Sequence, residues 1–333
     1  MDKMNFTQAV ARLRVLETRL LSNVKVERMI DSTSAEDVIK ILQETEYASL
    51  MVNVKRPEDY NILLKEELNR VYSLMYSVSP DPLIVDIMSL KYDYHNIKVM
   101  LKGKALNKDF SHMLIPVGTV DIEKLKLYMT AEDYRELNPK MREAIIQTEK
   151  VYNELKNPQK IDIIIDKYMY IDMLERAKET KIDFIIHYVV TSINFCNIKS
   201  IIRLKRQEKN VEFLKEVMLT GGDIANDILL RAFDDTIENM AAKFSSLKYG
   251  DVIKLGLEEY IKTGKLSALE KLSENYIMKT LKVAKYITFG PEPVFAYILA
   301  KETEIKIIRI IMVGKLNNVD TIVIRERVRE VYA

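Results

Sequence analysis

Residues 96–104 read NIKVMLKGK, and residues 307–315 read IIRIIMVGK. Both stretches place apolar residues around a basic residue and end in Gly-Lys. A third stretch, NIKSIIRLK at residues 197–205, begins 101 positions after the first. Internal repetition of this kind indicates an architecture built from copies of one supersecondary unit. The chain is therefore predicted to contain three related units.

Two of the copies also share their opening. A Pro-acid-Pro triplet ends at Pro82 in the first copy and at Pro293 in the third, 16 positions before Lys98 and Arg309 respectively. Proline suits the start of a helix, because the N–H group that it lacks has no partner there. The middle copy has Lys-Ile-Asp at residues 181–183 instead, so it departs most from the pattern.

An apolar stripe supports the same register. Five positions in each copy have spacings that fall on one side of a helix with 3.6 residues per turn. These fifteen apolar residues are Ile84, Ile87, Tyr94, Ile97 and Leu101; Ile185, Tyr188, Phe195, Ile198 and Ile202; and Phe295, Ile298, Ile305, Ile308 and Met312. Chance could supply one such match, whereas three in register indicate a duplication. The stripe is predicted to form the core of each unit.

The composition favours helices over strands. The 333 residues include only 9 glycines and 8 prolines, too few for the many turns of an all-β fold. Each unit is a little over a hundred residues long, far more than the roughly 34 to 47 residues of the common helical repeats, so each can bury its own small core. The sequence therefore predicts an all-α protein of three similar helical bundles, at residues 1–125, 126–233 and 234–333.

Local signals predict several helix boundaries. Apolar periodicity predicts an amphipathic helix over residues 5–22. A hydroxyl followed three residues later by an acid predicts helix starts at residues 33–37, with a helix through Leu42, and at residues 130–133. The short β-branched stretch at residues 319–324 also fits a helix. Three glycines followed by lysine are predicted to end helices: Gly103, Gly264 and Gly314.

One basic position recurs in every copy, roughly 40° from the centre of the apolar stripe. An acid or amide recurs five positions earlier, as Asp93, Asn194 and Glu304. Two interpretations stay open: the basic stem packs along the core edge while its head reaches water or a carboxylate, or the basic heads together bind an acidic partner. The candidate partner-binding residues are Lys98, Lys102, Lys104, Lys199, Arg203, Lys205, Arg309 and Lys315.

Charge and cysteine content limit the classes of function. Lys and Arg number 51 against 49 Asp and Glu, a net charge of +2, whereas a protein that coats nucleic acid carries a basic surplus, so we expect no nucleic-acid partner. Cys196 is the single cysteine and cannot form an intrachain disulfide, which fits the reducing cytoplasm. The start of the sequence does not resemble a signal peptide, and no stretch reaches about 18 uninterrupted apolar residues. We therefore expect no membrane span.

No motif for catalysis or for a cofactor stands out. The Gly-Lys pairs lack the earlier glycine and the following Ser or Thr of a phosphate-binding loop. His95, His112 and His187 are too isolated in sequence for a zinc site. Cys196 is predicted to be a buried structural thiol, and residues 221–223 (Gly-Gly-Asp) are predicted to be a turn plus a helix cap. The sequence therefore predicts no catalytic residues, no metal and no cofactor.

One block of the sequence is especially distinctive, KYDYHNIK at residues 91–98. Further elements accompany it along the chain: ARLRVLE at 11–17, Leu20-Leu21, GPEP at 290–293, AKE at 300–302, Ile308-Arg309, Gly314-Lys315 and IRER at 324–327. With these elements and the repeat, the chain resembles the C subunit of the archaeal and bacterial A/V-type ATPases, the counterpart of the d subunit in eukaryotic V-type enzymes. The resemblance spans essentially the whole chain in order, and Asn194 departs from it where the other copies have an acid.

The resemblance implies a funnel-like, three-lobed protein that acts as a non-catalytic subunit of the central stalk. It would join the membrane rotor ring to the central-shaft subunits during ATP-linked transport of protons or sodium ions, without binding nucleotide itself. It would be cytoplasmic, held at the membrane through the complex, and monomeric when isolated. The alternative is a helical scaffold or adaptor unrelated to ATPases, and a helical enzyme is a third hypothesis.

Overall fold

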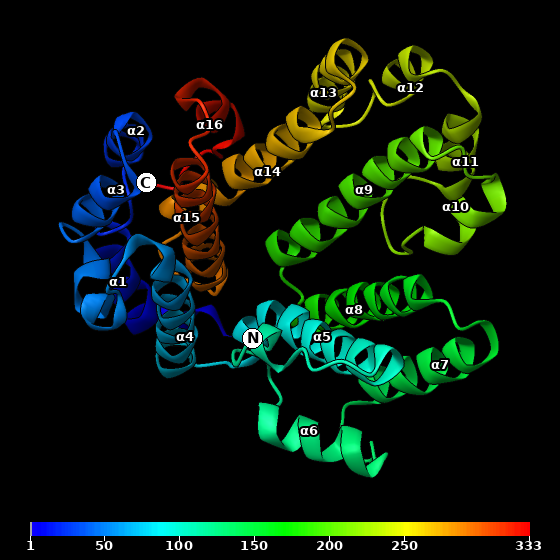
Figure 1. The fold of residues 1–333 in the computed structure, drawn as a ribbon, viewed down its shortest axis with the longest axis horizontal. Helices are drawn as coiled ribbons and strands as arrows, with labels where there is room; N and C mark the ends of the chain where they lie inside the picture. Colours follow the sequence, from blue (N-terminus) through cyan, green and yellow to red (C-terminus); the bar gives the residue numbers. More distant parts are fainter. Residues whose placement is uncertain (1) are drawn as a thin grey trace. The chain divides into compact units, whose positions relative to one another are not determined.

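All regular structure in the described part of the chain is helical. The computed structural model describes residues 2–333, and this range contains no β-strand, so the predicted all-α class is confirmed (Figure 1). The α-helices are α1 (Thr7–Glu17), α2 (Asn23–Asp31), α3 (Ala35–Leu42), α4 (Tyr60–Val78), α5 (Leu83–Leu106), α6 (Ile122–Ala131), α7 (Pro139–Leu155), α8 (Pro158–Thr180), α9 (Asp183–Arg206), α10 (Val211–Val217), α11 (Asn226–Asp234), α12 (Ile237–Lys243), α13 (Gly250–Thr263), α14 (Ser267–Leu281), α15 (Glu292–Leu316) and α16 (Thr321–Arg327). Short 3-10 helices are η1 (Lys3–Phe6), η2 (Glu46–Asn53), η3 (Pro57–Asp59), η4 (Ser111–Met113) and η5 (Lys282–Tyr286).

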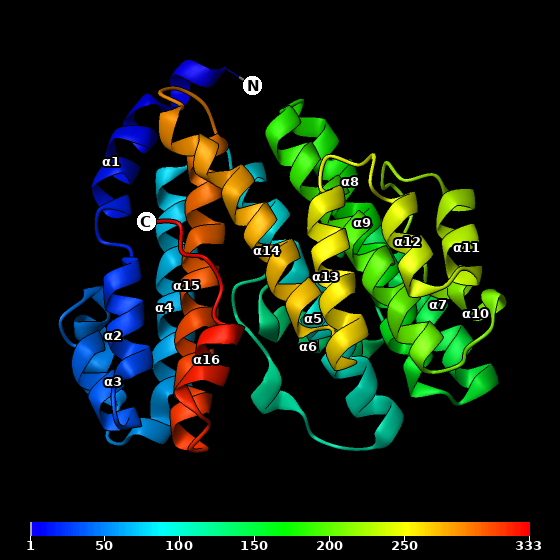
Figure 2. The same ribbon diagram turned by 90° about the horizontal axis from the view of Figure 1, so that it is seen from above.

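The chain forms two compact units. The terminal unit contains the residues up to Val85 together with Thr236–Ala333, and the central unit contains Asp86–Asp235. In the terminal unit α15 packs against α1, α2, α3, α4 and α16, and α14 pairs with α13. In the central unit α8 packs against both α7 and α9, and α10 and α11 also pack on α9 (Figure 2). The division into three helical bundles and their funnel-like arrangement stay predictions.

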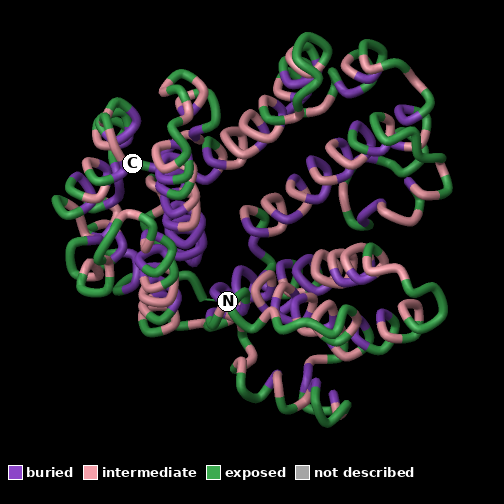
Figure 3. The backbone as a smooth tube through the Cα atoms, viewed as in Figure 1, coloured by how far each residue is buried: buried purple, intermediate pink, exposed green. Residues whose placement is uncertain are grey.

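The three repeated stripes lie on the long helices α5, α9 and α15. Fourteen of the fifteen stripe residues are buried, and Tyr188 is half-buried. Figure 3 shows the burial along α15 most clearly, as a nearly continuous buried track. The stripe is therefore core, as predicted, because an apolar face of this length is stable only when it is removed from water.

The three long helices end in the same way. One or two residues past the end of each helix the backbone is left-handed, at Asn107 (φ 49°), Glu208 (φ 53°) and Asn318 (φ 52°). The next N–H donates five residues back, from Lys108 to Gly103, from Lys209 to Leu204 and from Val319 to Gly314. This is the Schellman pattern, and it satisfies carbonyl groups that would otherwise lack a partner.

Two of the three predicted glycine stops are wrong. Gly264 ends α13 with φ 65°, as predicted. Gly103 and Gly314 instead lie inside the last turn of α5 and α15. A Cβ atom at Gly103 would lie 3.0 Å from the Lys108 carbonyl oxygen, and one at Gly314 would lie 2.6 Å from Ile324. These glycines let the returning chain approach the helix closely.

The other predicted boundaries have mixed outcomes. The start at residues 33–37 is confirmed, because Ser34 caps α3 by accepting the Asp37 N–H at 3.2 Å. The start at residues 130–133 is wrong: α6 ends there, with Glu132 left-handed at its C-cap (φ 53°). The next helix begins later, where Pro139 occupies the first position of α7. The helix predicted over residues 5–22 is shorter (α1), and residues 319–324 contribute to α16 as expected.

Among residues 2–333, one helix has the length and composition of a membrane span. This helix is α9, but 56% of its apolar window is buried inside the protein. Its apolar stripe is part of the packed core, and α8, α10 and α11 all pack against it. Helix α9 is therefore the core helix of the central unit.

The left-handed residue at the end of α9 gives a stability prediction. Replacing Glu208 with glycine should raise the free energy of unfolding by about 1 kcal/mol, because only glycine adopts this conformation without strain. The control Lys150→Gly, at an exposed position inside α7, should lower it by about 1 kcal/mol. Urea denaturation measures both, and a loss of stability in both variants would contradict the prediction.

Candidate functional site

The predicted basic residues of the first copy pair with carboxylates of their own unit. The Lys98 ammonium lies 2.5 Å from Asp166 and 3.6 Å from Asp162, both on α8. The Lys102 ammonium lies 2.7 Å from Asp162. Because the Lys98 side chain is only 21% exposed, its stem packs at the core edge and its head meets a neighbouring carboxylate.

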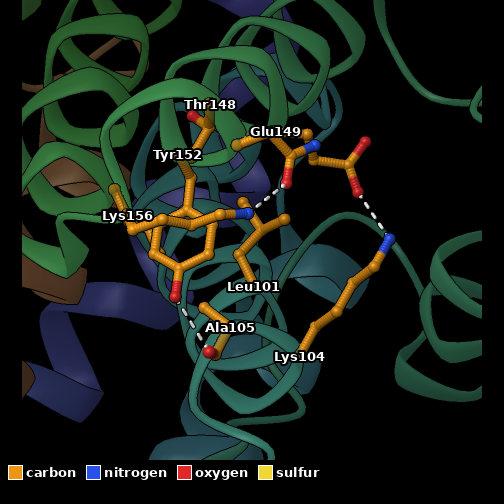
Figure 4. Close-up of a pocket in the computed structure, with 9 residues that line it drawn as sticks. Leu101, Lys104, Ala105, Thr148, Glu149, Tyr152 and Lys156 are labelled. Atoms are coloured by element: carbon orange, nitrogen blue, oxygen red, sulfur yellow. Dashed lines mark hydrogen bonds and ion pairs between the residues drawn. The ribbon is translucent and has the colours of Figure 1, made fainter.

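Lys104 ties the end of α5 to two other helices. Its ammonium lies 2.6 Å from Glu132, at the end of α6, and 2.9 Å from Glu149 on α7. The hydrogen bonds to Glu132 and then to Glu149 raise the pKa of Lys104. Figure 4 shows the ammonium reaching Glu149 and, separately, the Tyr152 hydroxyl, which donates to the Ala105 carbonyl at 2.9 Å. The charge of Lys104 is thus matched inside the central unit.

Two cavities of about 390 Å³ each flank Lys104. The cavity drawn in Figure 4 is lined by Leu101 and Ile161 and by Thr148, whose buried hydroxyl has no hydrogen-bond partner among the described residues. The other cavity lies between the end of α5, residues 108–114 and α6. Both are lined by apolar side chains mixed with charged groups of both signs, so we assign no ligand to either.

The basic residues of the middle copy lie along α9. Lys205 donates to the Phe233 carbonyl, and its ammonium lies 5.4 Å from the centre of the Phe233 ring. Lys199 is half-buried and Arg203 is exposed. Lys205 therefore stabilises its own unit, by fixing the end of α11.

The two basic residues of the third copy belong to the terminal unit. Lys315 donates to the Ser32 carbonyl at 2.6 Å, which ties α15 to the end of α2, whereas Arg309 is exposed. The structure thus brings Lys98, Lys102 and Lys104 together on α5 and distributes the other predicted residues over both units. Binding of a partner by any of the eight stays a prediction.

The acid or amide five positions before each basic residue is buried and binds backbone. We call Asp93, Asn194 and Glu304 the latch residues. Asp93 accepts hydrogen bonds from the Thr119 N–H (2.8 Å), the Thr119 hydroxyl (2.8 Å) and the Val120 N–H (3.0 Å). Val120 directly precedes the N-cap residue of α6. Asp93 therefore ties the middle of α5 to the start of α6.

The middle latch is an amide with fewer and longer bonds to backbone. The Asn194 side chain accepts the Ile224 N–H at 3.5 Å and donates to Asp223. Ile224 directly precedes the N-cap residue of α11, so the place in the fold is the same. Both short latch side chains need glycine opposite, since a Cβ atom at Gly118 or Gly222 would lie 2.2 Å from the latch oxygen.

The third latch closes on the other end of the chain. Glu304 accepts the Leu21 N–H at 2.6 Å, and Leu21 directly precedes Ser22, the N-cap residue of α2. The residue that corresponds to Gly118 and Gly222 is here Arg19. Glutamate is one methylene longer than aspartate, so it reaches the backbone without requiring glycine.

Glu304 also belongs to a buried ionic cluster. The fully buried Lys301 ammonium lies 2.8 Å from Glu304 and 2.9 Å from Glu67 of α4. Arg70 pairs with Glu67 at 2.7 Å, and the Tyr47 hydroxyl donates to Glu304 at 2.9 Å. Burial lowers the pKa of Lys301, but the attraction of Glu304 and Glu67 outweighs burial and the pKa is raised. Lys301 is therefore charged, and it holds α15, α4 and η2 together.

Sequence reasoning missed a second set of polar residues. Asn96 exchanges two hydrogen bonds of 2.9 Å with the Ile115 backbone, and Asn197 does the same with Leu219 at 2.8 and 2.9 Å. The signal was present, because an asparagine opens the Asn-Ile-Lys block in both copies. The third copy has Ile307 instead, where the adjoining segment is the helix α1 and satisfies its own backbone.

The remaining candidates have structural roles. Cys196 is half-buried rather than buried, and its sulfur lies 3.2 Å from the Tyr170 hydroxyl. Gly221 forms a turn with φ 95°, as predicted, but the predicted helix cap at Asp223 is wrong because Ala225 is the N-cap residue of α11. Within residues 2–333, no group of three or more His, Cys, Asp and Glu side chains could hold a metal ion.

A family model described as ATP synthase (C/AC39) subunit matches residues 9–327. The chain belongs to this family. Members of the C/AC39 family are subunits of V-type and A-type ATPases, so this chain is a subunit of a rotary ATPase, a multi-subunit complex that functions in ion transport.

Curated relatives support the same assignment along the full chain. The C subunit of the V-type sodium ATPase of Enterococcus hirae is 26% identical over 96% of this chain and 97% of its own length. The C subunit of the A-type ATP synthase of Methanocaldococcus jannaschii is 29% identical over 92% of this chain and 82% of its own length. The corresponding protein of a Desulfurococcus species is 26% identical over 96% and 90%.

The buried cluster gives a prediction for the terminal unit. Replacing Lys301 with methionine should lower the free energy of unfolding by about 3–5 kcal/mol, because Glu304 and Glu67 stay buried without their cation. The control Lys306→Met removes a partly exposed ammonium 2.6 Å from Glu274 and should cost less than about 1 kcal/mol. Similar losses in the two variants, measured by chemical denaturation, would show that burial of the cluster contributes nothing.

The latch in the central unit predicts a pH dependence. Burial raises the pKa of Asp93 to about 6, against the opposing hydrogen bonds from Val120 and Thr119. The folded protein therefore binds the proton more tightly than the unfolded chain, whose carboxyl pKa is about 4. The stability contributed by Asp93 is fully present below pH of about 4 and is lost as the pH rises through about 6.

Asparagine at position 93 would not titrate. The free energy of unfolding of Asp93→Asn, minus that of the wild type, should therefore increase by about 2 kcal/mol between pH 4 and pH 7.5. Urea denaturation at the two pH values measures this difference. A difference that stays constant with pH would contradict the predicted protonation of Asp93.

Proposed function

We propose that this chain is the non-catalytic central-stalk subunit that couples the membrane rotor ring of its ATPase to the central shaft. In this function it transmits rotation during ATP-linked proton or sodium-ion transport and itself neither hydrolyses ATP nor moves ions. The match to the C/AC39 family over residues 9–327 and the naming of its relatives as C subunits support the proposal. Membership of this family counts against an unrelated helical scaffold or adaptor.

The observation that carries the proposal is that the N-terminal segment is tied both to the core helix α15 and to the C-terminal residues. Glu304 of α15 accepts the Leu21 N–H at 2.6 Å, and the Tyr332 hydroxyl donates to Glu17 of α1 at 3.2 Å. A part that transmits torque must resist deformation, and close-packed helices with tied ends do so. A protein that only tethers other proteins has no need of this stiffness.

The proposed partners are the rotor ring and the central-shaft subunits. In this proposal the protein is monomeric when isolated, has the funnel-like three-lobed form of its family, and is held in the cytoplasm against the membrane through the complex. Of the eight candidate partner-binding residues, Arg203 and Arg309 are both exposed, so a partner can reach their side chains. Lys98, Lys102 and Lys104 already have carboxylate partners in their own unit, so any partner would compete with them.

An add-back experiment tests the function. Membrane vesicles from cells that lack the gene should retain ATP hydrolysis but lose ATP-driven ion uptake, because the head and the ring are no longer joined. Adding the purified chain should restore uptake, measured with an ion-sensitive dye. ATP-driven ion uptake that is undiminished without the chain would contradict the proposal.

Two charge reversals distinguish basic residues that bind a partner from basic residues that stabilise their own unit. Arg309→Glu should leave folding intact and reduce the restored uptake, because Arg309 is exposed. Lys98→Glu should lower the melting temperature, because it places a third carboxylate beside Asp166 and Asp162. Full restoration by folded Arg309→Glu would remove this residue from the proposed interface.

A further inference from the structure

The connection between α14 and α15 is much longer than its counterparts. It spans residues 282–291, whereas α4 and α5 are joined by residues 79–82, and α8 and α9 by residues 181–182. Two to four residues therefore suffice to join the helices at this point of the repeat. The additional residues in the third copy are not needed for the connection itself.

This long loop is held firmly from the inside. The Arg14 guanidinium donates to the Ala284 carbonyl at 2.9 Å and to the Ile287 carbonyl at 2.6 Å. Lys282 pairs with Glu330 at 2.7 Å, and Ala284 is fully buried. The loop thus has a fixed shape, which reduces the entropy lost on binding.

The outer side of the loop is apolar and aromatic. Tyr286 is 87% exposed, Val283 55% and Phe289 41%. Val283 and Tyr286 lie on the same side of η5, because a 3-10 helix has three residues per turn. Exposed Met4 belongs to η1, which lies beside the end of this loop because Lys3 pairs with Glu292 at 3.5 Å (Figure 2).

The charges around the outer side are mainly basic. Lys279 is exposed one turn before Val283, and Lys3, beside the end of the loop, has a side chain that is 57% exposed. Lys282 and Lys285 are half-buried, Lys282 against Glu330 and Lys285 with its ammonium 4.9 Å from the centre of the Tyr332 ring. A surface of this kind complements apolar side chains accompanied by carboxylates.

We propose that residues 282–291, the docking loop, bind an acidic and apolar segment of another subunit of the ATPase. The inference rests on the proposed function and names the surface that one of the partners contacts. Tyrosine and phenylalanine on a rigid backbone are typical of the few residues that dominate a protein interface. Because the loop is fixed, it exposes Tyr286 and Phe289, together with Met4, in a conformation that is already suited to binding.

Binding to the ATPase tests the docking loop. The probe is the complex purified from cells that lack the gene, immobilised and titrated with wild-type or variant chain. Tyr286→Ala and the double variant Tyr286→Ala/Phe289→Ala should weaken binding by about 30-fold or more. Lys279→Glu should weaken it less, and the wild-type affinity should fall as salt rises. The control Val52→Ala removes an 86% exposed side chain of the terminal unit and should bind like the wild type.

Thermal denaturation shows whether each variant is folded. If the double variant is unfolded, the binding of the single variant Tyr286→Ala decides the test. Equal binding by wild-type chain and folded Tyr286→Ala would overturn the docking loop and leave the proposed function standing. Failure of the wild-type chain to bind the complex would overturn both.

A parallel flotation assay uses vesicles with about one third anionic lipid. Vesicle binding that Tyr286→Ala abolishes, with complex binding unchanged, would assign the loop to the membrane surface and overturn a protein partner.

Discussion

Three hydrogen bonds organise the fold: in each long helix, a buried polar side chain near the middle binds the backbone of another segment. Asp93, Asn194 and Glu304 each bind the N–H of the residue before a helix N-cap. An unpaired buried carboxylate would be strongly destabilising, so the segment opposite must stay in place. The apolar stripes supply most of the burial, and the latch residues fix which segment lies against each stripe.

The latch residues also show which segment of the chain each repeated helix binds. The first two close on the segment that follows them, and the third closes on Leu21 near the start of the chain. The terminal unit is therefore assembled from both ends of the sequence, and Lys301 strengthens the junction by binding carboxylates from two helices. Stiffness at this junction is consistent with a subunit whose proposed task is to pass rotation between partners.

Departures from the repeat mark places where the copies have specialised. Asn194 replaces a carboxylate, so the middle latch holds its segment by a longer bond than the other two. The connection at residues 282–291 is lengthened only in the third copy, and it exposes aromatic side chains that contribute little to the core. Duplication accounts for the common core, whereas the added loop is best explained by a contact outside the chain.

Helical periodicity is a local property, so the residues alone were enough to predict the all-α class, the three repeated stripes and their burial, and fourteen of the fifteen stripe residues are buried. The same repeat identified the latch positions, without their role. The contacts of each polar group, by contrast, were set by the tertiary fold: Lys98 binds Asp166, 68 positions away, and Glu304 binds Leu21, 283 positions away. Likewise Gly103 and Gly314 serve close packing rather than helix termination. Such pairings depend on which segments fold against one another, and no local pattern contains that information.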